Sequence, residues 1–142
     1  MDAFTLSSFY TTYVVLPNEH TVLSPCISDD LKVFPFFDGC LGAIDGTHVK
    51  ARVPADDAKR FHDRKGNITF NHLVACSMDM YFVYVCAGWE GSAADGRVYL
   101  NAHMTDFSVP ASKWYLADAG FPSCNTLLVP YRNQQYHLRE WM

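Results

Sequence analysis

Two aspartates in this chain lie in the same kind of local sequence. Asp45 follows an apolar run at residues 41–44 and precedes Gly46, and Asp118 follows a second apolar run at residues 114–117. Short apolar runs predict buried strands, so we expect each carboxylate at the C-terminal end of a strand, beside a glycine that lets the backbone turn. Paired carboxylate oxygens bind Mg²⁺ or Mn²⁺, the ions with which enzymes hydrolyse or transesterify phosphodiesters.

The same residues also have a purely structural interpretation. Asp-Gly is among the commonest turn dipeptides, because aspartate bonds to its own backbone and glycine tolerates positive φ. The alternative to a metal site is therefore two separate turns. Repetition of the pattern at the ends of two strands that can be neighbours in one sheet favours a shared site.

Composition is that of a folded domain. The chain has 142 residues, of which 49% are hydrophobic and 18% charged, and this balance predicts one globular unit with a real core. No apolar stretch approaches the ~20 residues that span a bilayer, so we expect no membrane partner. The first residues lack the basic region of a signal peptide, and the five cysteines are odd in number without C-x-x-C spacing. We therefore expect an intracellular protein with reduced thiols.

Charge is distributed unevenly along the chain. The net charge of −4 argues against a nucleic-acid partner, but six of the eleven basic residues fall between His48 and Gly66. A basic segment directly after the first candidate acid suits an anionic substrate, and a solvated surface explains it equally well. The candidate phosphate contacts are Lys50, Arg52, Arg64 and Lys65.

The elements that must position these residues follow from periodicity and turn signals. We expect residues 1–35 to form a helical and irregular lead-in, and residues 36–142 to form the domain. The expected elements of the domain are a strand at 41–45 that turns and continues at 49–53, helical turns at 54–61, a hairpin of strands 71–76 and 82–87, a helix capped by Ser92, and strands at 114–117 and 127–130. This order predicts a mixed α/β sheet in which the hairpin pairs beside the first strand and 114–117 is added in parallel.

Six short strings carry a resemblance to a known family. They follow one another over about residues 34–142: CLGAIDGTH at 40–48, RKG at 64–66, NHLVAC at 71–76, AGWEGSAAD at 87–95, LADAGFP at 116–122 and PYR at 130–132. With these strings the chain resembles the DDE-superfamily nuclease domain of PIF/Harbinger transposases and of the host proteins derived from them. The resemblance implies a ribonuclease H-like fold with flanking helices, and a metal-dependent DNA endonuclease.

The resemblance also implies a set of site residues. Asp45 matches the first catalytic and metal-binding acid and Asp118 the second, around Mg²⁺ or Mn²⁺. The third acid, a glutamate on a later helix, should lie beyond Met142, and Glu140 matches a different position. We therefore expect an incomplete domain with little or no cleavage activity alone. Two interpretations of Asp95 stay open, a helix-start acid and a metal ligand.

Partners and rival functions follow from the same residues. The resemblance implies DNA as partner, a Myb/SANT-like accessory protein and a nuclear location. A haloacid-dehalogenase-type phosphatase would need a nucleophilic aspartate at the position of Ala43, which cannot attack phosphorus. The remaining alternative is a domesticated, non-catalytic remnant of a transposase that binds DNA or protein.

Overall fold

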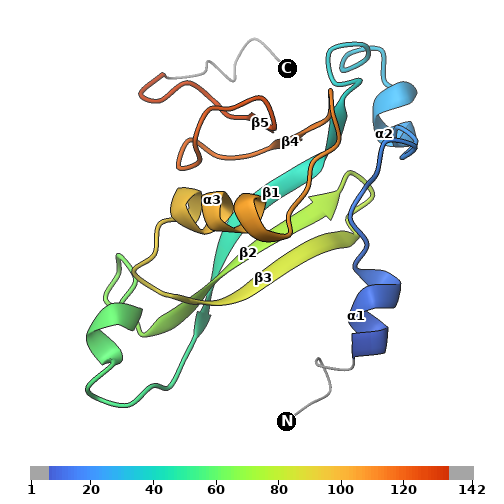
Figure 1. Cartoon of the computed structure of the whole chain (residues 1–142). Coiled ribbons are helices and arrows are strands. Elements are labelled where there is room, and N and C mark those ends of the chain that lie inside the picture. The colour runs from blue at the N-terminus through green and yellow to red at the C-terminus, as the bar shows by residue number, and fades with distance from the viewer. Residues whose placement is uncertain (1–6, 135–142) are drawn as a thin grey trace.

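The computed structural model describes residues 7–134 and shows a five-stranded mixed sheet in the order β3-β2-β1-β4-β5 (Figure 1). This is the expected α/β, ribonuclease H-like class of fold. In chain order the elements are α1 (Ser7–Tyr13), α2 (Pro25–Ser28), β1 (Cys40–Lys50), the 3-10 turn η1 (Ala58–Phe61), β2 (Thr69–Ser77), β3 (Phe82–Glu90), α3 (Asp95–Thr105), β4 (Trp114–Leu116) and β5 (Leu127–Leu128).

Strand directions agree with the expectation from sequence. β2 and β3 form an antiparallel hairpin, β2 pairs antiparallel with β1, and β4 is added parallel to β1 on its other side. The last strand, β5, is parallel to β4. It ends at Leu128 and is therefore shorter than the strand expected at 127–130. The sheet therefore places the two runs that precede the candidate acids on neighbouring parallel strands.

The predicted turn at Asp45-Gly46 is wrong. β1 continues through both residues to Lys50, with Asp45 opposite Val74 and Gly46 opposite Leu73 of β2. Unbroken antiparallel pairing with β2 holds this segment extended, so the local turn preference of Asp-Gly is overridden. Gly46 serves a close approach instead, since a side chain there would collide with the carboxylate of Asp95.

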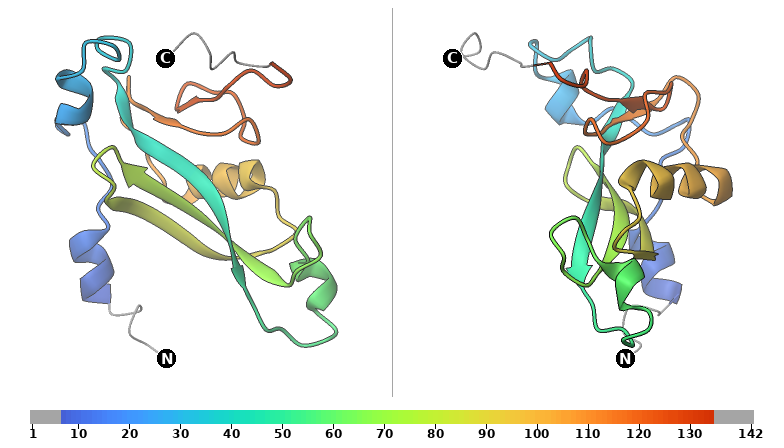
Figure 2. Two further views of the ribbon diagram at one scale, coloured as in Figure 1. Left: turned by 180° about the vertical axis from the view of Figure 1, so that it is seen from behind. Right: turned by 90° about the vertical axis from the view of Figure 1, so that its left-hand side faces the viewer.

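One face of the sheet is covered by α3. Alternate residues of β2 from Thr69 to Ala75 are buried, and Val98, Tyr99 and Ala102 of α3 belong to the same core. Figure 2 shows α3 against one face, while none of the helices in residues 7–134 covers the opposite face of β1, β2 and β3. The core therefore fixes the N-terminus of α3 over β1 and β2.

The sequence pattern predicted that Ser92 caps α3, and this prediction is wrong. The helix begins at Asp95, its N-cap is Ala94, and no side chain bonds to the first turn from the N-cap position. Ser92 lies two residues before this N-cap, and its amide bonds to the carbonyl of Arg60 at 3.2 Å. Asp95 is consequently the first residue of the helix and not its third.

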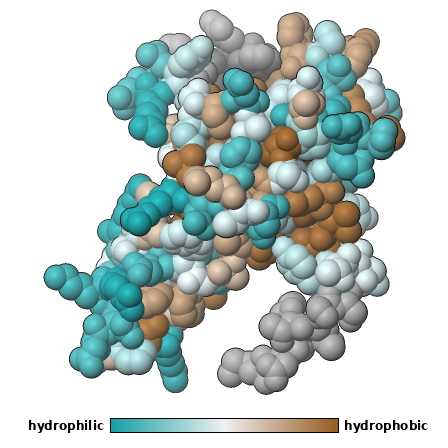
Figure 3. All heavy atoms as spheres, in the orientation of Figure 1, coloured by the Kyte–Doolittle hydropathy of each residue, from teal (hydrophilic) through white to brown (hydrophobic). Residues whose placement is uncertain are grey.

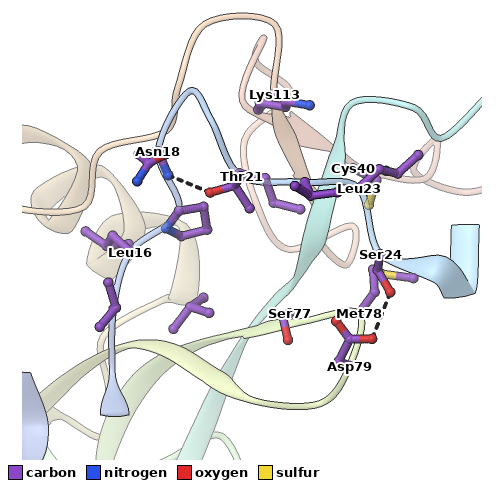
Figure 4. A pocket seen from close by; sticks show the side chains of 15 residues that line it. Leu16, Asn18, Thr21, Leu23, Ser24, Cys40, Ser77, Met78, Asp79 and Lys113 are labelled. Atoms are coloured by element: carbon purple, nitrogen blue, oxygen red, sulfur yellow. Dashed lines mark hydrogen bonds between the residues drawn. The ribbon is translucent and has the colours of Figure 1, made fainter. Parts of the chain in front are cut away.

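The segment before β1 packs onto the sheet. The hydroxyl of Tyr10 donates to the carbonyl of Val85 at 3.2 Å and accepts from its amide at 3.3 Å, which occupies backbone groups of edge strand β3. Ser24 Oγ donates to Asp79 Oδ1 at 2.8 Å at the β2–β3 turn. Figure 4 shows the hollow of about 250 Å³ between this segment, that turn and the start of β1. The division of the chain into a lead-in at residues 1–35 and a domain at residues 36–142 stays a prediction.

Two expectations drawn from composition concern cysteines and membrane spans. All five cysteines are free thiols, as expected. Among the helices of residues 7–134, none combines the length and the apolar character that a bilayer span requires.

Candidate active site

The register of β1 and β4 brings the two candidate acids to the same edge. Ala43 is paired with Leu116, and Asp45 and Asp118 each lie two residues further along their chains. Neighbouring strands are about 4.8 Å apart, so the two acids emerge side by side. Asp45 lies within β1, whereas Asp118 follows β4 in the connecting segment.

Electrostatics shows that the acids act on one another. Partial loss of hydration raises the pKa of Asp45 above its ordinary value, and the amide of Gly46 opposes this rise. The negative charges of Asp118 and Asp95 raise the pKa of Asp45 further. Asp45 therefore lies within electrostatic range of both Asp118 and Asp95.

Backbone amides hold one oxygen of each candidate acid. The amide of Gly46 donates to Asp45 Oδ1 at 2.8 Å, and the amide of Gly120 donates to Asp118 Oδ1 at 2.8 Å. Within residues 7–134, the second oxygen of neither acid has a hydrogen-bond donor. Each carboxylate is thus oriented through one oxygen and has the other available for a ligand.

Asp95 is held next to this pair by a residue that the sequence reasoning missed. Asn71 Nδ2 donates to Asp95 Oδ1 at 2.8 Å, across the gap between β2 and α3. The only local signal was an asparagine at the start of an apolar strand pattern, and its partner 24 residues away could not be read from it. Asp95 also lies in the first turn of α3, where a negative charge interacts favourably with the helix dipole.

Two of the four predicted phosphate contacts gather beside Asp95. Arg64 and Lys65 line a hollow of about 440 Å³ together with His48, His62 and Asp95, whereas Lys50 and Arg52 are not among its lining residues. Figure 3 shows hydrophilic side chains over the end of the molecule that carries η1 and the loop after it. The hollow therefore lies between the basic loop and the start of α3, and neither Asp45 nor Asp118 is among its lining residues.

The four candidate phosphate contacts differ from their basic neighbour Arg60. Arg60 bonds to Asp57 at 2.6 Å and to Glu90 at 3.4 Å. Within the part of the chain that the structure describes, no ion pair engages the candidates, and all four side chains are exposed. They are therefore available to an anion in a way that Arg60 is not. The four are Lys50, Arg52, Arg64 and Lys65.

The loop that presents Arg64 and Lys65 is organised by Asp63. Its Oδ1 accepts from the amides of Lys65 and Asn67, both at 2.8 Å. The Asn67 amide makes the largest contribution to a lowered pKa of Asp63. These contacts show that Asp63 gives the basic loop its shape.

The donor set suits a hard cation that keeps part of its hydration. Asp45 and Asp118 offer carboxylate oxygens, the ligands that Mg²⁺ and Mn²⁺ prefer. Among residues 7–134, no three His, Cys, Asp or Glu side chains form a group that could hold a metal ion by themselves. Asp45 and Asp118 would therefore leave most of the coordination positions of such an ion to water.

A mixed ribonuclease H-like sheet whose parallel strands β1 and β4 lead to two acids is consistent with a nuclease-type domain. Comparison with known families agrees: the family described as DDE superfamily endonuclease matches residues 44–140. The chain belongs to this family of endonucleases, and its curated relatives are Harbinger transposase-derived.

The relatives are longer than this chain. It is 30% identical over 107 residues to the rat protein named "Putative nuclease HARBI1", with 73% of this chain and 31% of the relative covered. It is 30% identical over 113 residues to "Protein ALP1-like" of Arabidopsis thaliana, with 67% of this chain and 28% of the relative covered. The chain thus spans under a third of the length of these relatives. No solved structure matches it.

Proposed function

We propose that this chain carries the first two acids of a metal-dependent DNA endonuclease site, with Asp45 and Asp118 as catalytic residues and cation ligands. The observation that carries the proposal is the register of β1 and β4, which sets both acids side by side. The family to which the chain belongs supports it, because its description is that of an endonuclease.

The proposed site assigns separate tasks to the cation and to the protein. Mg²⁺ or Mn²⁺ bound there would lower the pKa of an attacking water or hydroxyl and stabilise the leaving oxygen of a phosphodiester. Asp45 and Asp118 hold the cation, and the amides of Gly46 and Gly120 keep both carboxylates oriented before it binds.

DNA is the proposed substrate. Four exposed basic side chains would contact backbone phosphates, which positions a duplex without reading its sequence. The proposed contacts are Lys50, Arg52, Arg64 and Lys65. We also propose, from the family resemblance, a nuclear location and a Myb/SANT-like accessory protein.

We expect the 142-residue chain to bind the cation weakly and to cleave DNA little or not at all. Two carboxylates leave most coordination positions to water, and the affinity of such sites rises with the number of charged ligands. The test measures Mn²⁺ binding by electron paramagnetic resonance, and plasmid relaxation in the same buffer. Asp45→Asn and Asp118→Asn should each lower Mn²⁺ affinity about tenfold or more, because each removes one of two charged ligands.

The matched control is Asp56→Asn, which changes an exposed acid outside the site. It should leave Mn²⁺ affinity unchanged. Equal affinity in the wild-type chain and both site variants would remove the two acids from the proposal. Robust cleavage by the wild-type chain would contradict the expectation that two carboxylates are too few.

A second candidate function is a non-catalytic remnant of a transposase that binds DNA or protein. The observation that favours it is the absence, within residues 7–134, of a group of three side chains that could hold a metal ion. This candidate predicts DNA or protein binding that is insensitive to Mn²⁺ and to Asp45→Asn. The binding measurements on the site variants therefore separate the two functions.

A further inference from the structure

Two hollows adjoin the segment that joins β3 to α3. The hollow that contains Arg64 and Lys65 has a volume of about 440 Å³, and a second one of about 540 Å³ lies against the end of β3. Both are lined by Ser92, Ala93 and Ala94, in the segment that Figure 1 shows between β3 and α3. Each volume falls within the ~300–1,000 Å³ of pockets that bind small ligands, so each hollow has room for a nucleotide.

Hydrogen bonds hold the segment between the hollows in place. The amide of Ser92 donates to the carbonyl of Arg60 at 3.2 Å, and the carbonyl of Ala93 accepts from Asn71 Nδ2 at 3.0 Å. Asn71 is only 1% exposed, so its bond is shielded from water. The segment is therefore a fixed wall, and its small side chains leave little between one hollow and the other.

The acidic side chains of both hollows already have partners in the protein. Asp63 accepts from two backbone amides of its own loop, and Asp95 accepts from Asn71 at 2.8 Å. Glu90, in the second hollow, pairs with Arg60 at 3.4 Å. These carboxylates are thus stabilised by donors of the fold itself.

The strongest bases of the two hollows have no such partners. Arg64 and Lys65 line the first hollow and Arg97 lines the second, and all three side chains are exposed. Within residues 7–134, none of the three forms an ion pair. Uncompensated positive charge in both hollows suits an anion that extends from one to the other, as a chain of phosphates does.

Trp89 gives the second hollow an aromatic wall. Its side chain packs against the core, yet it is only half-buried and lines the hollow. Space is open beside it, because a Cβ on the neighbouring Gly88 would meet no atom within 4 Å. An aromatic side chain that the core fixes on one side can stack on a nucleic-acid base on the other.

We propose that the two hollows together bind an unpaired DNA strand. Its phosphates contact Arg97 as well as the loop of Arg64 and Lys65, and one base stacks on Trp89. A basic groove combined with an aromatic platform is the arrangement that binds single strands, whereas the bases of a duplex are already stacked on one another. The inference rests on the proposed function for the choice of DNA, and it does not depend on the cation site.

The first test concerns Arg97. Fluorescence anisotropy measures the affinity for a short labelled single strand and for the duplex made from it, without divalent cations. Arg97→Ala should weaken single-strand binding several-fold and flatten the dependence of log affinity on log salt concentration by about 0.7, because one phosphate contact is lost. Lys32→Ala, which changes the net charge equally at an exposed residue before β1, is the matched control and should leave both quantities unchanged.

The second test concerns Trp89, with thermal melting as the check on folding. Trp89→Leu should weaken single-strand binding about tenfold and leave duplex binding unchanged, because only an unpaired base can stack there. Trp89→Phe keeps an aromatic face and should retain most of the affinity. If Trp89→Leu does not fold, indole fluorescence replaces it: the single strand should quench the wild-type chain, and Trp89→Phe should lose that quenching.

The outcomes separate this inference from the function beneath it. Unchanged single-strand affinity in Arg97→Ala and Trp89→Leu, with binding that depends only on Arg64 and Lys65, would overturn the groove and leave DNA as the proposed substrate. Equal losses for single strand and duplex in Trp89→Leu would overturn the stacking. Absence of binding to either form of DNA would overturn DNA as the ligand, while the Mn²⁺ affinities of Asp45→Asn and Asp118→Asn would still decide the cation site.

Discussion

At the scale of single residues, each acid of the candidate site is held through one oxygen by a fixed donor. The donors are the backbone amides of Gly46 and Gly120 and the side-chain amide of Asn71. Orientation by groups that cannot rotate away keeps a carboxylate in place before a ligand arrives. The glycines therefore contribute amides and space, and at Gly46 no turn is involved.

Asp63 leads to a prediction about pH. The amides of Asn67 and Lys65 stabilise its charged form, so the pKa of Asp63 is lowered from its ordinary value of 3.8. A depressed pKa stabilises the folded loop at every pH above the unfolded value, and the benefit is lost as pH falls through the folded pKa. In an acid titration followed by NMR, the amide signals of Lys65 and Asn67 should shift together with a midpoint below 3.8.

The same titration contains its control. In Asp63→Ala the coupled movement of the Lys65 and Asn67 signals should disappear, while the signals of residues outside this loop should move as in the wild-type chain. A midpoint at or above 3.8 in the wild-type chain would show that the two amides do not hold the Asp63 carboxylate.

The candidate acids could be predicted from sequence, and the contacts around them could not. Asp45 and Asp118 were proposed because the apolar runs before them are local patterns, and both runs form strands in the folded sheet. The role of Asn71 depends on the packing of α3 against β2, and the role of Gly46 depends on where Asp95 comes to rest. Neither fact is encoded within a window of neighbouring residues.

At the scale of elements, strand identity and direction were predictable while element ends were not. The hairpin of β2 and β3 and the parallel addition of β4 followed from apolar runs and chain order. The end of β1 was misplaced because pairing with β2 extends it past Asp-Gly, and α3 has Ala94 rather than Ser92 as its N-cap. Tertiary pairing decides such boundaries.

The basic loop after η1 predicts a salt-dependent interaction with DNA. Each phosphate contact contributes a slope of about −0.9 to the dependence of log affinity on log salt concentration. The double variant Arg64→Ala/Lys65→Ala should therefore flatten this slope by about 2 and weaken binding regardless of DNA sequence. Fluorescence anisotropy with a labelled duplex at several salt concentrations measures both quantities.

Arg60→Ala is the matched control for the basic loop. Arg60 lies nearby but is already engaged by Asp57 and Glu90, so its loss should leave the slope almost unchanged. Slopes that change equally in the control and in the double variant would mean that the response follows net charge and not the loop.

At the scale of the whole molecule, the basic residues are distributed unevenly, because six of the eleven fall between His48 and Gly66. The chain is acidic overall, with a net charge of −4, yet Arg64 and Lys65 lie together on one loop beside the hollow at the start of α3. An anionic polymer would be attracted by the loop and repelled elsewhere, which favours one approach to the site. The chain spans under a third of the length of these curated relatives. The activity that their full length would carry therefore stays a proposal for this chain.

The most direct test of a cation shared by Asp45 and Asp118 is an NMR titration with Mn²⁺, because the bound ion broadens the amide signals nearest to it. A shared site predicts that the signals of Gly46 and Gly120 broaden first and together, and that Asp45→Asn protects both. Broadening centred on another acidic pair, such as Asp56 and Asp57, with Gly46 and Gly120 unaffected, would contradict the shared site.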